Sequence, residues 1–178
     1  LRVLALFTSY NMGLFAITTM TPLYLRANHD FSWFETALAM AAMMTAGALA
    51  QPWMGKISDG IGRRPLIILG NALACGAAII AWAFSSVAIT LVALGVAMTA
   101  LVAIRAVLQA AAVDHAGNRE GTSLGLTFAF MDGFAATAAV LAGLAGESDL
   151  ANAFLLASGF SLIAVVLALT LPKKQHVG

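Results

Sequence analysis

The chain has 178 residues, of which 61% are hydrophobic and 10% are charged, and its mean hydropathy is +0.93. A soluble domain has about a quarter of its residues charged, so this composition excludes a soluble globular protein and indicates one whose solvent is the lipid bilayer. The formal net charge is +1 and the cations lie in short segments, which excludes a nucleic-acid-binding face.

Six apolar segments are long enough to cross a bilayer as helices, which requires about 20 residues each. In chain order, they cover residues 3–25, 33–54, 66–84, 87–113, 123–145 and 150–171. None alternates apolar and polar residues as barrel strands do, so the predicted fold class is an all-α membrane protein. We expect one six-helix transmembrane domain over residues 1–178, with a charged cytoplasmic loop at 55–65 and a cytoplasmic tail at 172–178.

The first segment is unusually polar for a membrane span, with hydroxyl, phenol and amide side chains between residues 8 and 21. Asn11 and Thr18 are seven residues apart and therefore share one face of the predicted helix. Such side chains either contact a ligand or hydrogen-bond to their own helix and its neighbours. Pro22, near the end of this span, predicts a kink or a loosened last turn.

The second and third spans have marked beginnings. The sequence from Ser32 to Glu35 is typical of a capping box, in which the two side chains each bond the other residue's backbone. We therefore expect the second helix to begin at Trp33. Pro65 favours the start of the third helix, because proline is well tolerated in the first turn.

The segment between these two spans is the most informative part of the sequence. It reads GKISDGIGRRP and places three cations, one acid and three glycines between two apolar runs. Gly55 and Gly62 allow close approach of backbones, and Asp59 can accept hydrogen bonds from a helix N-terminus or an arginine. A simpler interpretation is that Lys56 and the two arginines only bind the anionic lipid surface.

The cations also predict an orientation. If six helices alternate in direction, seven cations fall on one side of the membrane and Arg26 falls on the other. By the positive-inside rule the cation-rich side is cytoplasmic, which places both termini in the cytoplasm. The seven cations on that side are Arg2, Lys56, Arg63, Arg64, Arg119, Lys173 and Lys174.

Arg105 and Asp132 lie well inside predicted spans, where an ionisable side chain is costly and is a functional candidate by default. They lie about 12 and 14 Å from the same membrane face, and the loop between their helices is short. Three interpretations are open: a structural ion pair, a cavity site in which Arg105 binds an anionic substrate, and proton coupling through Asp132.

The sequence contains no nucleophile triad, phosphate-binding loop or Cys/His ligand set, and its three histidines lie in different segments. We therefore predict that the chain is not an enzyme and holds no metal or cofactor. Cys75 lies inside an apolar run and is interpreted as a packing residue.

The segment 55–65 resembles the loop signature of the major facilitator superfamily of solute transporters, Gly-x-x-x-Asp-(Arg/Lys)-x-Gly-(Arg/Lys)-(Arg/Lys). Gly60 departs from it, standing where the family prefers a cation. Residues 21–25, Gln51-Pro52, the stretch 109–125 and residues 171–174 resemble the family's C-terminal half, so the resemblance covers nearly the whole chain. The matching residues of the signature are Gly55, Asp59, Gly62, Arg63 and Arg64.

The resemblance implies a fold of twelve helices in two halves, of which this chain has the length of one half, itself a 3+3 repeat. It also implies that the first helix lines a central cavity, which makes Asn11, Thr18 and Gln109 candidate substrate contacts beside Arg105 and Asp132. The signature segment would act as a conformational gate. In that role, Asp59 would contact the missing half, and Arg63 and Arg64 would hold Asp59 or lipid phosphates.

The predicted function is secondary active transport of a small solute by alternating access, as the C-terminal half of a twelve-helix transporter; proton-coupled efflux is one form of this prediction. The expected partners are membrane lipid, the solute, and an N-terminal half or a homodimer mate. The alternative is a non-transporting membrane module, either a truncated remnant or an assembly partner, because six helices supply only one wall of a solute cavity. The chain begins without Met inside an apolar run, which suggests a fragment. The predicted location is a bacterial plasma membrane.

Overall fold

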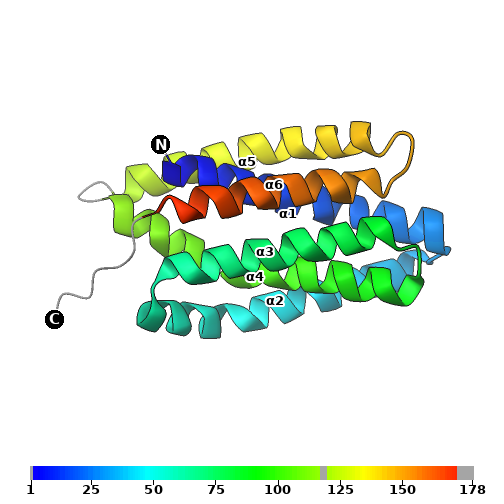
Figure 1. Cartoon of the computed structure of the whole chain (residues 1–178), viewed down its shortest axis with the longest axis horizontal. Helices are drawn as coiled ribbons and strands as arrows, with labels where there is room; N and C mark the ends of the chain where they lie inside the picture. Colours follow the sequence, from blue (N-terminus) through cyan, green and yellow to red (C-terminus); the bar gives the residue numbers. More distant parts are fainter. Residues whose placement is uncertain (1, 117–119, 172–178) are drawn as a thin grey trace.

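The computed structural model describes residues 2–116 and 120–171, which form long helices joined by short turns (Figure 1). All of these helices are long and apolar enough to cross a membrane. Each corresponds to one predicted span, so the predicted all-α membrane fold is confirmed. The helices are α1 (Arg2–His29), α2 (Trp33–Ile61), α3 (Arg63–Ala83), α4 (Val87–Ala116), α5 (Glu120–Ala145) and α6 (Asn152–Leu169).

Two of the predicted helix-end features are informative. The capping box is present: the Glu35 backbone N–H donates to Ser32 Oγ at 3.2 Å, and the Ser32 backbone N–H donates to Glu35 Oε2 at 2.8 Å. α2 begins at Trp33, as predicted. α1, by contrast, continues through Pro22 to His29, beyond its predicted end at residue 25. The predicted tail at 172–178 lies outside the described residues.

The predicted loop at 55–65 is wrong, because this segment is helical except at one residue. α2 continues to Ile61 and α3 begins at Arg63, so only Gly62 separates the two helices. Asp59 and Arg63 are four residues apart and bond each other, and a helical backbone satisfies peptide groups that an open loop would leave to water. Gly62 has φ 91°, a conformation that favours glycine, and the chain changes direction at this residue between α2 and α3.

Four helices form a square core. α1 packs against α4 and α6, and α3 also packs against both α4 and α6. The other two helices flank this square: α2 packs on α4, and α5 packs on α1. In Figure 1 α5 and α2 accordingly lie at the two opposite edges of the bundle.

The packing has an internal symmetry. Exchanging α1 with α4, α2 with α5 and α3 with α6 converts the α1–α5 contact into the α2–α4 contact, and the α1–α6 contact into the α3–α4 contact. The α3–α6 contact converts into itself. This is the relationship expected of two three-helix repeats, which agrees with the predicted 3+3 organisation.

The flanking helices are the least covered by the rest of the chain. Only 17% of the most apolar stretch of α2 and 19% of that of α5 is buried, against 39–50% in the other helices. Close approach of helices to α4 depends on small residues. A Cβ added to Gly70 of α3 would lie 2.5 Å from Ile104 of α4, and one added to Gly47 of α2 would lie 2.6 Å from Val102.

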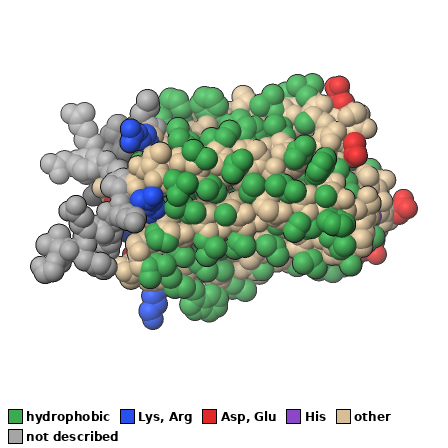
Figure 2. All heavy atoms as spheres, in the orientation of Figure 1, with side chains coloured by type: hydrophobic (Ala, Val, Ile, Leu, Met, Phe, Trp, Pro, Cys, Tyr) green, Lys and Arg blue, Asp and Glu red, His purple; other side chains and the backbone are tan. Residues whose placement is uncertain are grey.

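Charges of opposite sign gather at opposite ends of the bundle. Figure 2 shows Lys and Arg side chains at one end and Asp and Glu side chains at the other. We call these the basic end, which carries Arg2, Lys56, Arg63 and Arg64, and the acidic end, which carries Asp30, Glu35, Glu147 and Asp149. Arg26 lies at the acidic end, and Asp59 and Asp114 lie at the basic end.

Candidate functional site

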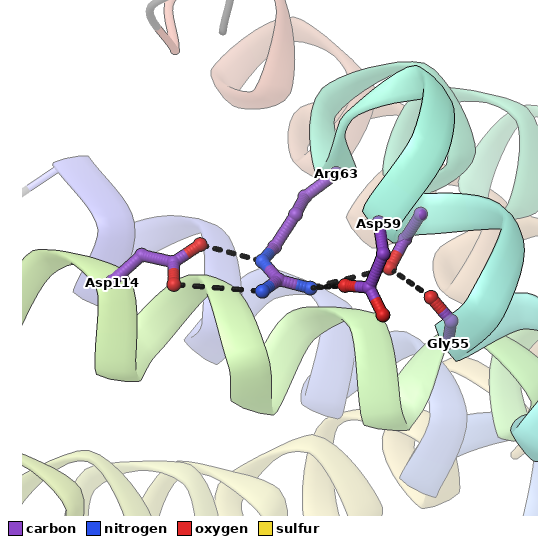
Figure 3. Close-up of polar contacts among 5 residues, drawn as sticks. Gly55, Asp59, Arg63 and Asp114 are labelled. Carbon is purple, nitrogen blue, oxygen red and sulfur yellow. Dashed lines mark hydrogen bonds and ion pairs between the residues drawn. The ribbon is translucent and has the colours of Figure 1, made fainter.

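The strongest polar cluster of the described residues is centred on Arg63, the first residue of α3 (Figure 3). Its Nε donates to Asp114 Oδ2 at 2.5 Å and its Nη2 donates to Asp114 Oδ1 at 3.5 Å. The guanidinium therefore meets the Asp114 carboxylate with two nitrogens, which fixes their relative orientation. Asp114 lies in the last turn of α4, so this contact ties the start of α3 to the basic end of α4.

The third nitrogen of Arg63 faces the end of α2. Arg63 Nη1 donates to Ser58 Oγ at 3.2 Å and to Asp59 Oδ1 at 3.4 Å. The buried Ser58 hydroxyl in turn donates to the Gly55 carbonyl at 2.7 Å. One guanidinium thus joins the ends of three helices, and the signature residues Gly55, Asp59 and Arg63 belong to one hydrogen-bonded cluster, next to the Gly62 turn.

Asp59 holds the outermost place in this cluster. Its side chain is 71% exposed, whereas that of Arg63 is 26% exposed. A pair this exposed contributes little to stability, about 0.2–1 kcal/mol. The Arg63 guanidinium contacts Asp114 more closely than Asp59.

Arg64 makes a contact that was not predicted. Its Nη2 donates to the Leu169 carbonyl at 2.7 Å, so it caps the end of α6. A cation at a helix C-terminus is stabilising because it meets the negative end of the helix dipole. Arg64 does not face the same way as Arg63, since successive residues of a helix point about 100° apart. That Arg64 holds Asp59 or lipid phosphates stays a prediction.

A second polar region lies within the bundle, where α1 crosses α4. The Tyr10 hydroxyl donates to the Leu101 carbonyl at 2.7 Å, and Tyr10 is fully buried. The next residue, Asn11, is also buried, at 2% exposed. Arg105 lies one turn beyond Leu101 on α4 and is exposed, and Gln109 lies one turn beyond Arg105 and is half-buried. The structure therefore places Tyr10 and Asn11 of α1 near Leu101 of α4, with Arg105 and Gln109 one and two turns further along α4.

Thr18 and Asp132 stand apart from that group. The Thr18 hydroxyl donates to the Leu14 carbonyl of its own helix at 2.8 Å, which is the local bonding that the sequence left open as an alternative. Asp132 belongs to α5, but its side chain lies outside the described residues. α5 does contact α4, while packing mainly on α1. The pairing of Asp132 with Arg105 therefore stays a prediction.

Sequence reasoning missed Asp114, Ser58 and Tyr10. Asp114 could have been found from the sequence, because it is an acidic residue directly after the predicted fourth span, on the same predicted membrane side as the signature segment. Tyr10 offered no such signal, because its partner is a backbone carbonyl. Within the described residues, no group of three His, Cys, Asp or Glu side chains is arranged to hold a metal ion.

Comparison with known proteins identifies the family. The family model described as Major Facilitator Superfamily matches residues 3–178, so the chain belongs to this superfamily. It is therefore an integral multi-pass membrane protein of a transporter family.

Among curated proteins, the chain is similar to the proline/betaine transporters of Escherichia coli strain K12, Escherichia coli O157:H7 and Salmonella typhimurium strain LT2. Each of these is 34% identical to it over 71 residues. That region is 40% of this chain and 14% of the relative, so the match spans a small part of the length of those transporters.

Proposed function

We propose that the chain is the C-terminal six-helix half of a secondary active transporter that moves a small solute by alternating access. The observation that carries the proposal is the match of the whole apolar region to the transporter superfamily, together with the exchange symmetry of the helix packing. In transporters built from such repeats, the solute site lies near the bilayer midplane between the repeats.

The charge distribution supports an orientation for this half. The basic end carries Arg2 and the cations of the α2–α3 turn, so the positive-inside rule places that end, and with it both termini, in the cytoplasm. A bacterial plasma membrane is the proposed location, in line with the bacterial relatives.

The flanking helices are the proposed contact with a second half. α2 and α5 are the least buried helices, and a second six-helix domain laid against them would cover them. The partner is an N-terminal half or, if the chain acts alone, a second copy. Asp59, exposed at the end of α2, would then face a helix end of that partner and stabilise one conformation of the gate.

The crossing of α1 and α4 is the proposed wall of the solute cavity. It supplies Asn11, Arg105 and Gln109, and Thr18 lies on the same face of α1 as Asn11. Asp132 of α5 is the proposed site of proton coupling, which would be needed for proton-coupled efflux. The printed names of the relatives make L-proline and glycine betaine the first solutes to test.

The test is solute uptake by proteoliposomes that contain the full-length protein carrying this chain. We expect saturable uptake of a small solute that is reduced at least tenfold by Asp59→Asn, with the protein still folded. The matched control is Asp30→Asn, which removes an exposed acid at the opposite end. A folded protein that transports none of a broad solute panel would instead support the non-transporting module and contradict the proposal.

A further inference from the structure

Arg105 is a charged residue with an unusual position. It lies nine residues before Asp114, where the α4 span ends, and is therefore about 14 Å inside the basic end. It is nevertheless exposed in the isolated half. A guanidinium at this depth requires either an anionic partner or a water-filled cavity, because an ionisable side chain inside the membrane is costly.

The face of α4 that carries Arg105 is not the lipid-facing one. An apolar groove of about 560 Å³ runs between α3 and α4, and Val92 and Val96 line it on α4. Val92 is 67% exposed, as expected of a side chain that meets acyl chains. Arg105 is nine residues beyond Val96, which is two and a half helical turns at 3.6 residues per turn, so it points to the opposite side of the helix.

On that opposite side of α4, the polarity and burial of the side chains differ along the helix. Leu94, Met98 and Leu101 share the face of Arg105, at spacings of three and four residues, and all three are fully buried. Arg105 is exposed on this face and Gln109, one turn further, is half-buried, whereas Leu108 and Ala112 on the same face are buried. The face is thus apolar and buried toward the acidic end, and Arg105 and Gln109 interrupt it toward the basic end.

The described residues provide no acid for Arg105. Their ion pairs are those that Arg63 makes with Asp59 and Asp114. Asp114, which is the acid nearest to Arg105 along α4, is already held by Arg63. The polar groups nearest to Arg105 are neutral: the Tyr10 hydroxyl, which bonds the Leu101 carbonyl one turn before Arg105, and the amide of Gln109 one turn beyond it.

We propose that Arg105 is the anchor of a binding site for a small solute that carries a carboxylate. The inference rests on the proposed function, and it assigns the chemical class of the solute. The planar guanidinium donates two parallel hydrogen bonds to a carboxylate, and such charge-assisted pairs are strong where water is scarce. The amides of Asn11 and Gln109 orient the rest of the solute, since they offer donors and acceptors without charge.

The experiment measures the thermal shift of the purified full-length protein with matched probe pairs: glycine betaine and choline, L-proline and L-prolinol, acetate and acetamide. Each pair compares a carboxylate with a neutral group on a similar frame. The variants are Arg105→Gln, which removes the charge, and Arg105→Lys, which keeps the charge but cannot donate two parallel hydrogen bonds from a planar group. Arg2→Gln is the control, because it removes an exposed arginine outside the helix crossing.

We expect at least one carboxylate probe to raise the melting temperature of the wild type and of Arg2→Gln, and its partner without a carboxylate to do so far less. Arg105→Gln should weaken the apparent affinity at least about tenfold, and Arg105→Lys should be intermediate. The inference is overturned if Arg105→Gln keeps the shift, if the probes without a carboxylate act equally, or if no carboxylate probe shifts the wild type.

The same probes separate this inference from the proposed function. A carboxylate that binds through Arg105 but is never taken up by proteoliposomes would support the site and contradict transport. Uptake that is unchanged in the Arg105→Gln variant would support transport and contradict the carboxylate-binding site at Arg105. If Arg105→Gln does not fold, the affinity of Arg105→Lys decides, and an unchanged affinity in that variant contradicts the inference.

Discussion

Arg63, at the start of α3, donates hydrogen bonds from two nitrogens to Asp114, at the end of α4. The distance between Arg63 Nε and Asp114 Oδ2 is 2.5 Å. The two residues are 51 positions apart in the chain. Because the same guanidinium also reaches Ser58 and Asp59, it ties together the ends of α2, α3 and α4.

Removing the acid of this pair should loosen the basic end. Asp114→Asn should lower the free energy of unfolding by about 0.2–1 kcal/mol, because both side chains are partly exposed and solvent screens the interaction. Asp114→Asn, Arg63→Gln and the double variant form a thermodynamic cycle that can be followed by thermal unfolding. Additive losses would show that the contact contributes no coupling. Asp30→Asn at the acidic end is the control.

Two glycines near the turn should respond oppositely to the same substitution. Gly60 lies inside α2 with nothing within 4 Å of an added Cβ, so Gly60→Ala should stabilise the protein by up to about 1 kcal/mol. Gly62 has φ 91°, so Gly62→Ala should destabilise it by at least about 1 kcal/mol. Thermal unfolding of both variants checks the pair, and shifts of the same sign would contradict the assigned turn.

The contact between α3 and α4 should be sensitive to a single methyl group. In Gly70→Ala, the new Cβ would meet Ile104 Cγ2 at 2.5 Å, so the overpacking should cost about 1–3 kcal/mol of stability. Ile104→Val removes Cδ1, which lies at 2.8 Å, and should recover part of the loss. Gly76→Ala on the same helix is the matched control, because its added Cβ meets nothing within 4 Å. Equal effects at both glycines would refute the close approach.

The relation between Arg105 and Asp132 can be tested by a second cycle. If Arg105 binds a solute carboxylate, the effects of Arg105→Ala and Asp132→Ala on the stability of the solute-free protein should add within about 0.5 kcal/mol. Melting temperatures and unfolding free energies of the two single variants and the double variant give the coupling. A larger coupling would favour the structural ion pair instead.

The sequence predicted what depends on hydropathy and local chemistry. The spans and the capping box at Ser32 and Glu35 were correct, because apolar length and i to i+3 bonding are local properties. The signature segment was correctly identified as important, but it was wrongly predicted to be a loop. Its Asp59 and Arg63 are four residues apart, a spacing that also suits a helix. The contact of Arg63 with Asp59, four residues away, was predicted. The contact of Arg63 with Asp114 and the partners of Arg64 and Tyr10 could not be predicted, because each partner lies on a helix distant in sequence, and two of those partners are backbone carbonyls.

Alternating access is tested most directly by cysteine accessibility at position 109, in the full-length protein freed of other cysteines. A membrane-impermeant thiol reagent is applied to oriented vesicles from either side, with Val92→Cys as the lipid-facing control. We predict that Gln109→Cys reacts from both sides, in proportions that a transported solute shifts, whereas Val92→Cys reacts from neither. Reaction of Gln109→Cys from one side only, whether or not solute is present, would contradict the account.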